Sequence, residues 1–308
     1  MNRKMVYLLN PIAGTGNKSY IKDIIIKRTT EQAIPFELLS TSPDGDYRFL
    51  EEKIKNDNVT DIIIVGGDGS ISQVAGSLRH TGVRFGIIPC GSGNGLALTA
   101  GIPRSPDKAL DIIFEGKSGF IDSFYINNRF SCMLSGIGFD AQVAHEFAKQ
   151  PERGLWTYMR VTAKNFFNAR PRSFQLTVNG NSISTKAFFI SIANSNQFGN
   201  QFTIAPRASL TDGMLDIVVV QKMSKLQVLW SVLQQMRYGN VNEDMFSKNK
   251  ILYFHTKELE IDNPGLAPLH IDGDPAETAG HFTVGVVPSA FKLIQPSKMI
   301  TSFSPSVS

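Results

Sequence analysis

The sequence predicts two domains: an N-terminal α/β domain with a doubly wound parallel sheet, and a β-rich, mostly antiparallel C-terminal domain. Three observations support this. Apolar runs and helical stretches alternate over the first 120 or so residues, hairpin-like strands follow Gly119, and 308 residues are enough for about two domains with cores of their own. The predicted fold class is therefore an α/β domain followed along the chain by a β-rich domain.

The N-terminal half is organised as successive strand–helix pairs. The run Ile62-Ile63-Ile64-Val65 is apolar throughout, which is typical of a parallel strand buried on both faces. Strands are expected at residues 5–9, 36–39, 61–65 and 85–88, and helices at 19–31, 46–56, 71–79 and 96–100. This alternation favours a parallel sheet with helices on both faces.

The C-terminal half has a different pattern. Turn pairs such as Asn127-Asn128 and Asn179-Gly180 separate short apolar runs, as in β-hairpins. Strands are expected at 120–126, 129–134, 174–178, 187–193, 215–221, 259–262 and 282–287, and helices at 141–149, 155–168 and 224–238. The tail 301–308 is expected to be disordered.

The composition excludes several classes of protein. With 42% hydrophobic residues, 19% charged residues and a formal charge of +4, a disordered or fibrous chain is excluded. No apolar stretch approaches the roughly 20 residues that span a bilayer, and the run after Met1 is too short for a signal peptide. Two cysteines, Cys90 and Cys132, and five scattered histidines form no disulfide framework or metal spacing. We expect a cytoplasmic protein.

Three loops after predicted strands are rich in glycine: residues 10–16, 66–70 and 90–95. In a parallel sheet such loops share one edge, where ligands bind, and amides at helix N-termini suit phosphate oxygens. Neither a Walker A loop nor the dinucleotide fingerprint fits the spacing. Asp68 lies among the glycines of the second loop, and a carboxylate there suits phosphoryl transfer if a cation or a substrate hydroxyl is present.

These motifs resemble the diacylglycerol kinase catalytic-domain family, which includes bacterial lipid kinases and the sphingosine and ceramide kinases. The resemblance rests on Gly66-Gly67-Asp68-Gly69-Ser70 and Gly91-Ser92-Gly93-Asn94, and extends through Asn10-Pro11, Thr41, 136–140, 211–216 and 271–275. It implies an NAD kinase- or phosphofructokinase-like ATP domain at 1–120 plus 290–300, a sandwich-like lipid domain at 121–289, and ATP- and Mg²⁺-dependent phosphorylation of a lipid hydroxyl. The last strand, near 291–294, would return to the first domain.

The resemblance also implies roles for individual residues. It places Asp68 and Asp274 as candidate catalytic carboxylates and leaves the general base open between them. The implied metal site comprises Asp212, Ser209, Met214 and Asp122. The implied ATP contacts are Asn10, Pro11, Ala13, Gly14, Thr41, Gly66, Gly67, Asp68, Gly69, Ser70, Gln73, Gly91, Ser92, Gly93 and Asn94.

Two positions depart from the family pattern. Gly95 replaces an aspartate that bacterial diacylglycerol kinases carry after Asn94, and Thr15 replaces a lysine of the first loop. The resemblance therefore implies the class of lipid kinase and leaves open which lipid is the substrate. A kinase of a soluble substrate, like NAD kinase, and a non-catalytic nucleotide-binding protein remain alternatives.

A basic, aromatic segment between residues 149 and 172 suggests a way to reach lipid. Arg153, Trp156, Arg160 and Lys164 suit an anionic membrane interface, although the same pattern fits a helix whose aromatic side chains face the core. We expect a lipid substrate and an anionic membrane surface as partners, with peripheral membrane association and no nucleic acid. A homodimer is left open.

Overall fold

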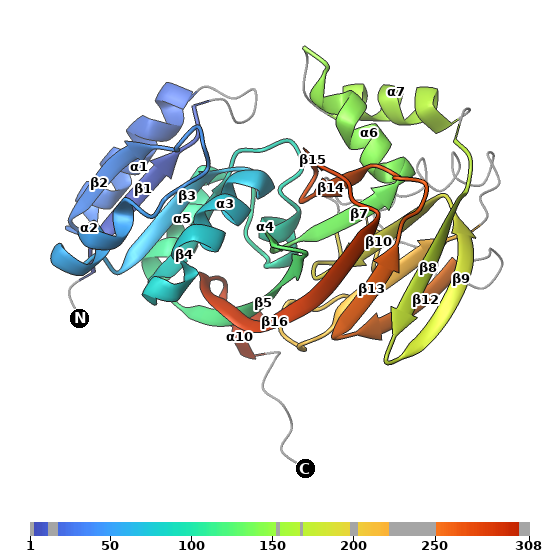
Figure 1. The fold of residues 1–308 in the computed structure, drawn as a ribbon. Helices are drawn as coiled ribbons and strands as arrows, with labels where there is room; N and C mark the ends of the chain where they lie inside the picture. Colours follow the sequence, from blue (N-terminus) through green and yellow to red (C-terminus); the bar gives the residue numbers. More distant parts are fainter. Residues whose placement is uncertain are drawn as a thin grey trace. The chain divides into compact units, whose positions relative to one another are not determined.

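The structure is a computed structural model that describes residues 3–11, 18–151, 155–166, 169–197, 203–221 and 251–301. The chain divides into two compact units, Met1–Asp122 with Ser289–Ser308, and Ser123–Pro288 (Figure 1). The predicted helix at 224–238 and the predicted disordered tail, apart from Thr301, lie outside the described residues.

The first unit is built on a parallel sheet, as predicted. Its strands are β1 (Met5–Leu9), β2 (Phe36–Ser40), β3 (Asp61–Gly66), β4 (Arg84–Pro89) and the C-terminal end of β16 (His281–Ile294). Their order is β2-β1-β3-β4-β16, and each neighbouring pair is parallel. Every residue of β3 is buried, which explains its unbroken apolar sequence.

Helices follow these strands in turn. They are α1 (Lys18–Glu31), α2 (Leu50–Asn56), α3 (Asp68–Leu78), the 3₁₀ turn η1 (Arg79–Thr81), α4 (Gly95–Thr99), α5 (Pro106–Glu115) and α10 (Ser297–Thr301). The connection from β1 to β2 runs across the sheet in the opposite direction from the connections β2 to β3 and β3 to β4. Because such crossovers are right-handed, α1 lies on one face of the sheet and α2 and α3 lie on the other. Arg28 of α1 bonds Asp107 and Asp111, so α1 packs beside α5.

Two helix predictions in this unit need correction, and one helix was not predicted. The second helix begins at Leu50 rather than at Asp46, because the Asp44 and Asp46 carboxylates accept backbone N–H groups and form turns instead. The third begins at Asp68, three residues before the predicted start. Helix α5 was not predicted, although Ser105 followed by Pro106 is a helix-start signal.

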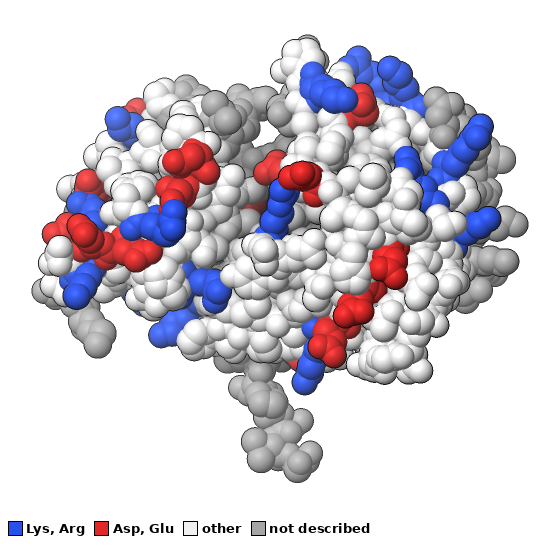
Figure 2. All heavy atoms as spheres, viewed as in Figure 1, with Lys and Arg blue, Asp and Glu red and all other residues white. Residues whose placement is uncertain are grey.

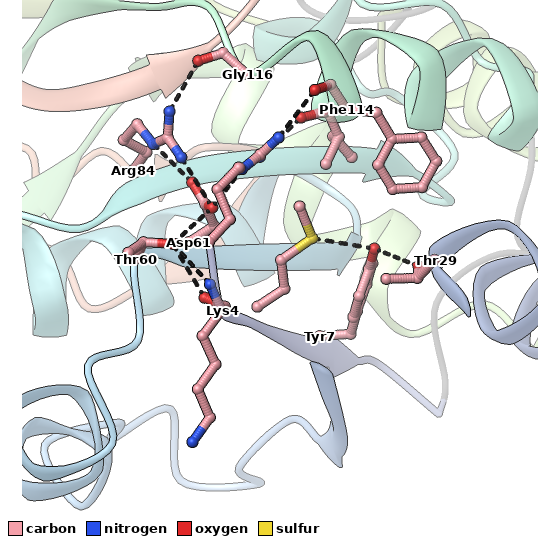
Figure 3. Close-up of polar contacts among 11 residues, drawn as sticks. Lys4, Tyr7, Thr29, Thr60, Asp61, Arg84, Phe114 and Gly116 are labelled. Carbon is pink, nitrogen blue, oxygen red and sulfur yellow. Dashed lines mark hydrogen bonds and ion pairs between the residues drawn. The ribbon is translucent and has the colours of Figure 1, made fainter. Parts of the chain in front are cut away.

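A buried ion-pair network fixes the amino ends of the central strands (Figure 3). The Asp61 side chain is fully buried and contacts Arg3 Nε at 2.9 Å and Arg84 Nε at 2.7 Å. The two guanidinium groups also donate to the carbonyls of Ile113, Phe114 and Gly116 at the end of α5. This network lies at the edge of the sheet opposite to the glycine-rich loops, because Asp61 begins β3 and those loops follow the strand ends.

The second unit contains two antiparallel arrays of strands. One array is β12-β11-β10-β7-β14-β15, and the other continues from β16 through β13 and β8 to β9. Its elements are β6 (Arg129–Ser131), β7 (Leu134–Gly138), α6 (Phe139–Ala148), α7 (Leu155–Phe166), β8 (Arg172–Val178), β9 (Asn181–Ala187), β10 (Phe189–Ala193), β11 (Leu215–Val220), β12 (Ile251–Thr256), β13 (Glu258–Asp262), β14 (Leu269–Ile271) and β15 (Asp274–Ala276). Strand β5 (Ser118–Ile126) contributes residues to both units.

One hydrophobic core joins the two arrays. It contains Phe174, Ile261 and Phe282 from one array and Ile192 and Ile217 from the other, all 3% exposed or less. Alternate residues of β8 and β13 point into this core, as expected for strands with one solvated face. The unit is therefore a β-sandwich, which confirms the predicted β-rich antiparallel domain.

Several strand predictions in this unit are inexact. The predicted strand 129–134 is two strands, since β6 ends at Ser131 and β7 begins at Leu134 in the other array. Residue Ala187 ends β9, which was not predicted. Strands β12, β14 and β15 were not predicted either. The segments at 282–287 and 291–294 form one strand, β16.

Candidate functional site

The loops that follow the four predicted strands leave the same edge of the parallel sheet. Backbone hydrogen bonds fix their first residues to neighbouring strands: Thr41 donates to Leu9 O, Asn10 to Val65 O, and Cys90 to Gly66 O, at 2.8–3.0 Å. This edge is the one at which α/β folds bind ligands. The loops with their polar and glycine residues therefore converge, as the sequence predicted.

The second and third loops touch through their glycines. A Cβ atom on Gly91 would lie 2.6 Å from Gly67 Cα, and one on Gly67 would lie 3.0 Å from Gly91 Cα. The contact at Gly91 leaves no room for a side chain, and the contact at Gly67 is tighter than most Cβ contacts, so glycine lets the two main chains approach this closely. The two main chains therefore run side by side where phosphate-binding amides are expected.

The other predicted nucleotide contacts extend this edge. The Asn10 side chain donates to Ser70 Oγ at 2.8 Å, which connects the first loop with the first turn of α3. The exposed Gln73 side chain lies against Gly45, where a Cβ would be 3.0 Å from its amide carbon. Pro11 is exposed at the end of β1, and Ala13 and Gly14 lie outside the described residues.

Thr41 directly follows β2 and contacts Tyr47, which lies in the loop between β2 and α2. Its side chain forms a hydrogen bond with Tyr47, whose hydroxyl also accepts the Ser42 N–H at 3.2 Å. Burial raises the pKa of Tyr47, so this hydroxyl stays neutral. It fixes the loop between β2 and α2.

Asp68 has a structural partner that the sequence did not indicate. It is 8% exposed, and its two carboxylate oxygens accept the N–H groups of Gly95 and Leu96 at 3.0 and 3.1 Å. These amides begin α4, where a carboxylate replaces the missing intrahelical partners. Asp68 therefore joins the first turn of α3 to the first turn of α4.

The third loop is closed by its own asparagine. Asn94 has φ +59° and is 2% exposed. Its side chain accepts the Gly91 N–H at 2.8 Å and donates to Gly91 O at 2.7 Å. Ser92 at the tip of the loop is exposed, so a ligand can reach its side chain.

Arg104 was not among the predicted site residues. Its exposed guanidinium donates to the carbonyl of Gly93 at 3.2 Å, so a positive charge lies beside the third loop. The lysine usual in the first loop is absent here, and Arg104 offers a cation at the same edge. An isolated arginine after Ile102-Pro103 gives no sequence signal for this role.

In the second unit, Asp274 is held at the end of a tight hairpin. It pairs with Ile271 across the β14–β15 turn, and the two residues between them, Asp272 and Gly273, have φ of +49° and +86°. Positive φ at both central residues is the mark of a two-residue type I′ hairpin. Asp274 is exposed, so its carboxylate is presented to solvent.

Asp272 anchors this hairpin to the segment before β7. It is 5% exposed and accepts hydrogen bonds of 2.8–3.2 Å from the Ser131 hydroxyl and from the amides of Cys132, Met133 and Leu134. Four donors on one buried carboxylate give it a structural role. The Asp-Gly pair of this motif therefore builds the turn, and Asp274 is the residue that the turn displays.

A buried histidine supports the same hairpin. His270 is fully buried; its Nδ1 accepts the Gly273 N–H at 3.3 Å, and its Nε2 lies 3.4 Å from Asp140 Oδ2. An amide can only donate, so Nε2 carries the proton that faces Asp140. A Cβ on Gly136 would lie 1.8 Å from Asp140 Oδ2 and 2.6 Å from His270 Nε2, so only glycine leaves room for this pair.

The residues implied as a metal site are divided between the two units. Asp212 is exposed in the turn before β11, where it accepts the Met214 N–H at 3.0 Å, and Ser209 Oγ accepts the Thr211 N–H. Asp122 belongs to the first unit and accepts the Ser289 N–H at 2.7 Å. Among the described residues, no group of three or more Asp, Glu, His or Cys side chains is arranged to hold a metal ion.

Within the second unit, the exposed Asp212 side chain has the donor chemistry that Mg²⁺ prefers. The ion keeps several waters and takes one or two carboxylates together with substrate phosphates, rather than a cage made wholly by protein. Asp212 and the neighbouring main-chain carbonyls are hard oxygen donors of that kind.

Three of the four residues predicted to contact a membrane lie on α7. Trp156, Arg160 and Lys164 are exposed, and Arg153 lies outside the described residues. Within the described part of the chain, no helix has both the length and the hydrophobicity needed to cross a membrane.

Comparison with known families covers nearly the whole chain. Residues 4–126 match the family model described as the diacylglycerol kinase catalytic domain. Residues 134–295 match the YegS C-terminal NAD kinase beta sandwich-like domain.

Individual relatives agree with these matches. The chain is 28% identical to a "Probable lipid kinase YegS-like" of Shewanella frigidimarina, covering 81% of this chain and 80% of that protein. It is 25% identical to a diacylglycerol kinase of Mycobacterium tuberculosis over 95% of both chains. An uncharacterized protein of Synechocystis is 26% identical over 87% of this chain, which spans 64% of that relative's length.

A solved structure has the same fold. The crystal structure of a diacylglycerol kinase from Bacillus anthracis superimposes with a TM-score of 0.72 at 18% identity, over 97% of this chain and 98% of that chain.

Proposed function

Because the chain belongs to the diacylglycerol kinase catalytic-domain family, we propose that it is an ATP- and Mg²⁺-dependent lipid kinase. It transfers the γ-phosphate of ATP to the hydroxyl of diacylglycerol or a related lipid. The observation that carries the proposal is the contact between the Gly67 and Gly91 main chains at the carboxyl edge of the parallel sheet. Such a bare backbone surface beside helix N-termini suits a polyphosphate.

In this proposal the first unit binds the nucleotide. The amides of Gly69 and Ser70 belong to the first turn of α3 and have no partner within the helix, so they are available to phosphate oxygens. Arg104 adds a positive charge beside the third loop. Asp68 acts as a positioning residue, because its oxygens hold the amides that begin α4.

Asp274 is the proposed general base. It is exposed, and the Asp272-Gly273 turn fixes its backbone, whereas Asp68 is almost fully buried against two amides. The lipid hydroxyl oxygen attacks the γ-phosphorus, the bond from that phosphorus to the β–γ bridging oxygen breaks, the hydroxyl proton passes to Asp274, and ADP leaves. Mg²⁺, when bound, neutralises charge on the phosphates, and Asp212 is the carboxylate proposed to hold it.

The test is transfer of labelled γ-phosphate from ATP to a panel of acceptors, with and without Mg²⁺. The panel contains diacylglycerol, sphingosine and NAD, together with a sample without acceptor. We expect Mg²⁺-dependent labelling of a lipid and loss of at least 100-fold in kcat for Asp274→Asn. Glu277→Gln is the matched control, since Glu277 lies three residues further along and its side chain is 88% exposed; it should retain activity.

The alternatives give different results in the same assay. Labelling of NAD in place of lipid would identify a kinase of a soluble substrate. Nucleotide binding without transfer to any acceptor would identify a non-catalytic nucleotide-binding protein. Full lipid labelling by Asp274→Asn would remove the base from the mechanism while leaving the lipid kinase assignment intact.

A further inference from the structure

Helix α7 has one face that is already packed. Val161 and Phe166 are 5% and 8% exposed and join Phe139 and Val143 of α6 in a small hydrophobic cluster. Tyr158 adds an edge-to-face contact with Phe147, with ring centroids 5.5 Å apart. The aromatic residues Tyr158 and Phe166 therefore pack against α6, and this packing accounts for their presence in the helix.

The opposite face exposes a large aromatic side chain. Trp156 is 79% exposed, more than any other large hydrophobic residue in the described part of the chain. The remaining exposed residues of α7 are Arg160, Ala163 and Lys164. Positions four, seven and eight residues after Trp156 lie on the same side of a helix. The outer face of α7 thus presents one indole with two cations and no acid.

Charges on the neighbouring helix extend this surface. Lys149 at the end of α6 pairs with Glu146 at 2.8 Å, and Lys149 and then Lys164 lower the pKa of Glu146. Among the described residues of α6 and α7, the exposed charged groups are Lys149, Arg160 and Lys164, and Glu146 and His145 are half-buried. Figure 2 shows basic side chains gathered over the α6 and α7 region of the view.

This combination matches the physics of an interfacial helix. An indole is apolar over most of its area and carries one N–H donor, which suits the boundary between lipid headgroups and acyl chains. Basic residues near an anionic surface contribute about 1 kcal/mol each. The face carries an apolar anchor as well as cations, and the binding of an interfacial helix increases with both the apolar area that it buries and its electrostatic attraction to anionic lipids.

We propose that the outer face of α7, formed by Trp156, Arg160 and Lys164, docks on an anionic membrane, with the indole inserted among the headgroups. This inference rests on the proposed function, because a lipid kinase must reach a substrate that stays in a bilayer. It names the partner of the site and does not depend on which lipid is phosphorylated.

Vesicle sedimentation tests the docking without reference to catalysis. The full chain is mixed with vesicles of phosphatidylcholine alone, or of phosphatidylcholine and phosphatidylglycerol at a ratio of about 7:3. We expect binding to the anionic vesicles only, weakened by 0.5 M NaCl because added salt screens exposed charges (about 3 Å Debye length at 1 M). Arg160→Gln/Lys164→Gln should weaken binding about 10- to 30-fold, and Trp156→Ala about 10-fold.

Matched controls separate this face from general charge and hydrophobicity. Lys55→Gln/Lys108→Gln removes two exposed lysines from α2 and α5, and Phe49→Ala removes an aromatic side chain that is 60% exposed. All the substituted side chains are exposed, so the thermal unfolding midpoint should stay within about 1–2 °C of the parent protein. Both control proteins should bind anionic vesicles like the parent.

The outcomes distinguish the docking from the kinase proposal. Phosphorylation of a short-chain lipid in detergent should be unchanged in the α7 variants, whereas phosphorylation of the same lipid class in anionic vesicles should fall with binding. Equal vesicle binding by the α7 variants and the controls overturns the docking and leaves the kinase standing. Binding of a nucleic acid oligomer that the α7 variants lose, with no vesicle binding, also overturns it.

Discussion

Substituting Asp68 separates a catalytic from a structural role for this residue. The side chain is 8% exposed, and its two oxygens accept the amides of Gly95 and Leu96. Asp68→Ala removes both acceptors and leaves two buried N–H groups without them. Asp68→Asn keeps one carbonyl oxygen but turns an NH₂ group toward the other amide, so one of the two bonds survives.

The contacts give the expected size of each effect. Hydrogen bonds to a charged group contribute about 1.5–3 kcal/mol each, and loss of a helix-capping side chain costs about 0.5–2 kcal/mol. We therefore expect Asp68→Ala to lower the free energy of unfolding by about 2–4 kcal/mol, and Asp68→Asn by about half as much. For a unit of this size, the larger loss lowers the unfolding midpoint by about 5–10 °C.

The assay combines thermal unfolding with steady-state kinetics for both variants. If Asp68 positions the loops, kcat/KM for ATP falls further in Asp68→Ala than in Asp68→Asn, in step with stability. Asp107→Asn is a control for an acidic residue in another first helical turn; its partly exposed ion pair with Arg28 contributes about 1 kcal/mol or less. If both Asp68 variants lose catalysis equally while their unfolding midpoints match the parent, the reasoning is refuted and Asp68 becomes the candidate base.

Three further predictions follow from other contacts. Asp61→Asn leaves two arginines facing a neutral amide in a buried site, so it should lower the free energy of unfolding by about 3–5 kcal/mol in urea; a loss below 1 kcal/mol would contradict the network. Burial raises the pKa of Tyr7 to about 12, and unfolded tyrosine ionises near 10. Stability that is present below pH 10 should therefore fall between about pH 10 and 12, and Tyr7→Phe should reduce this fall by up to about 3 kcal/mol. Arg104→Ala should raise KM for ATP about 3- to 10-fold with little change in kcat, whereas an unchanged KM would remove Arg104 from the nucleotide site.

The sequence predicted the elements whose signals are local. Strand β3 is apolar along its whole length because both of its faces are buried, and glycines mark the loops that meet at Gly67 and Gly91. The helix start at Ser105-Pro106 was also local and was overlooked. Short strands such as β14 and β15, with three residues each, carry too little periodicity to be recognised.

Contacts between distant segments were beyond sequence reasoning. Asp272 meets donors about 140 positions earlier in the chain, and no spacing rule links those residues. The partner of Asp68 lies 27 positions away, and its role depends on two helices starting at the same edge of the sheet. The local sequence predicts that a carboxylate has a structural or functional role. The tertiary fold determines which backbone amides form hydrogen bonds with it.

Most carboxylates in the family motifs of this chain have a structural role in the loops and turns. Asp68, Asp122, Asp212 and Asp272 each accept at least one backbone N–H, and a short side chain such as aspartate suits contacts made so close to the main chain. Their presence in a sequence therefore indicates that the loops and turns are built in a particular way. It does not identify the group that performs the chemistry, because the turn made by Asp272 and Gly273 could display a carboxylate or another side chain at the next position. For this reason a family match predicts the scaffold more firmly than the substrate, and the catalytic assignment depends on Asp274 itself.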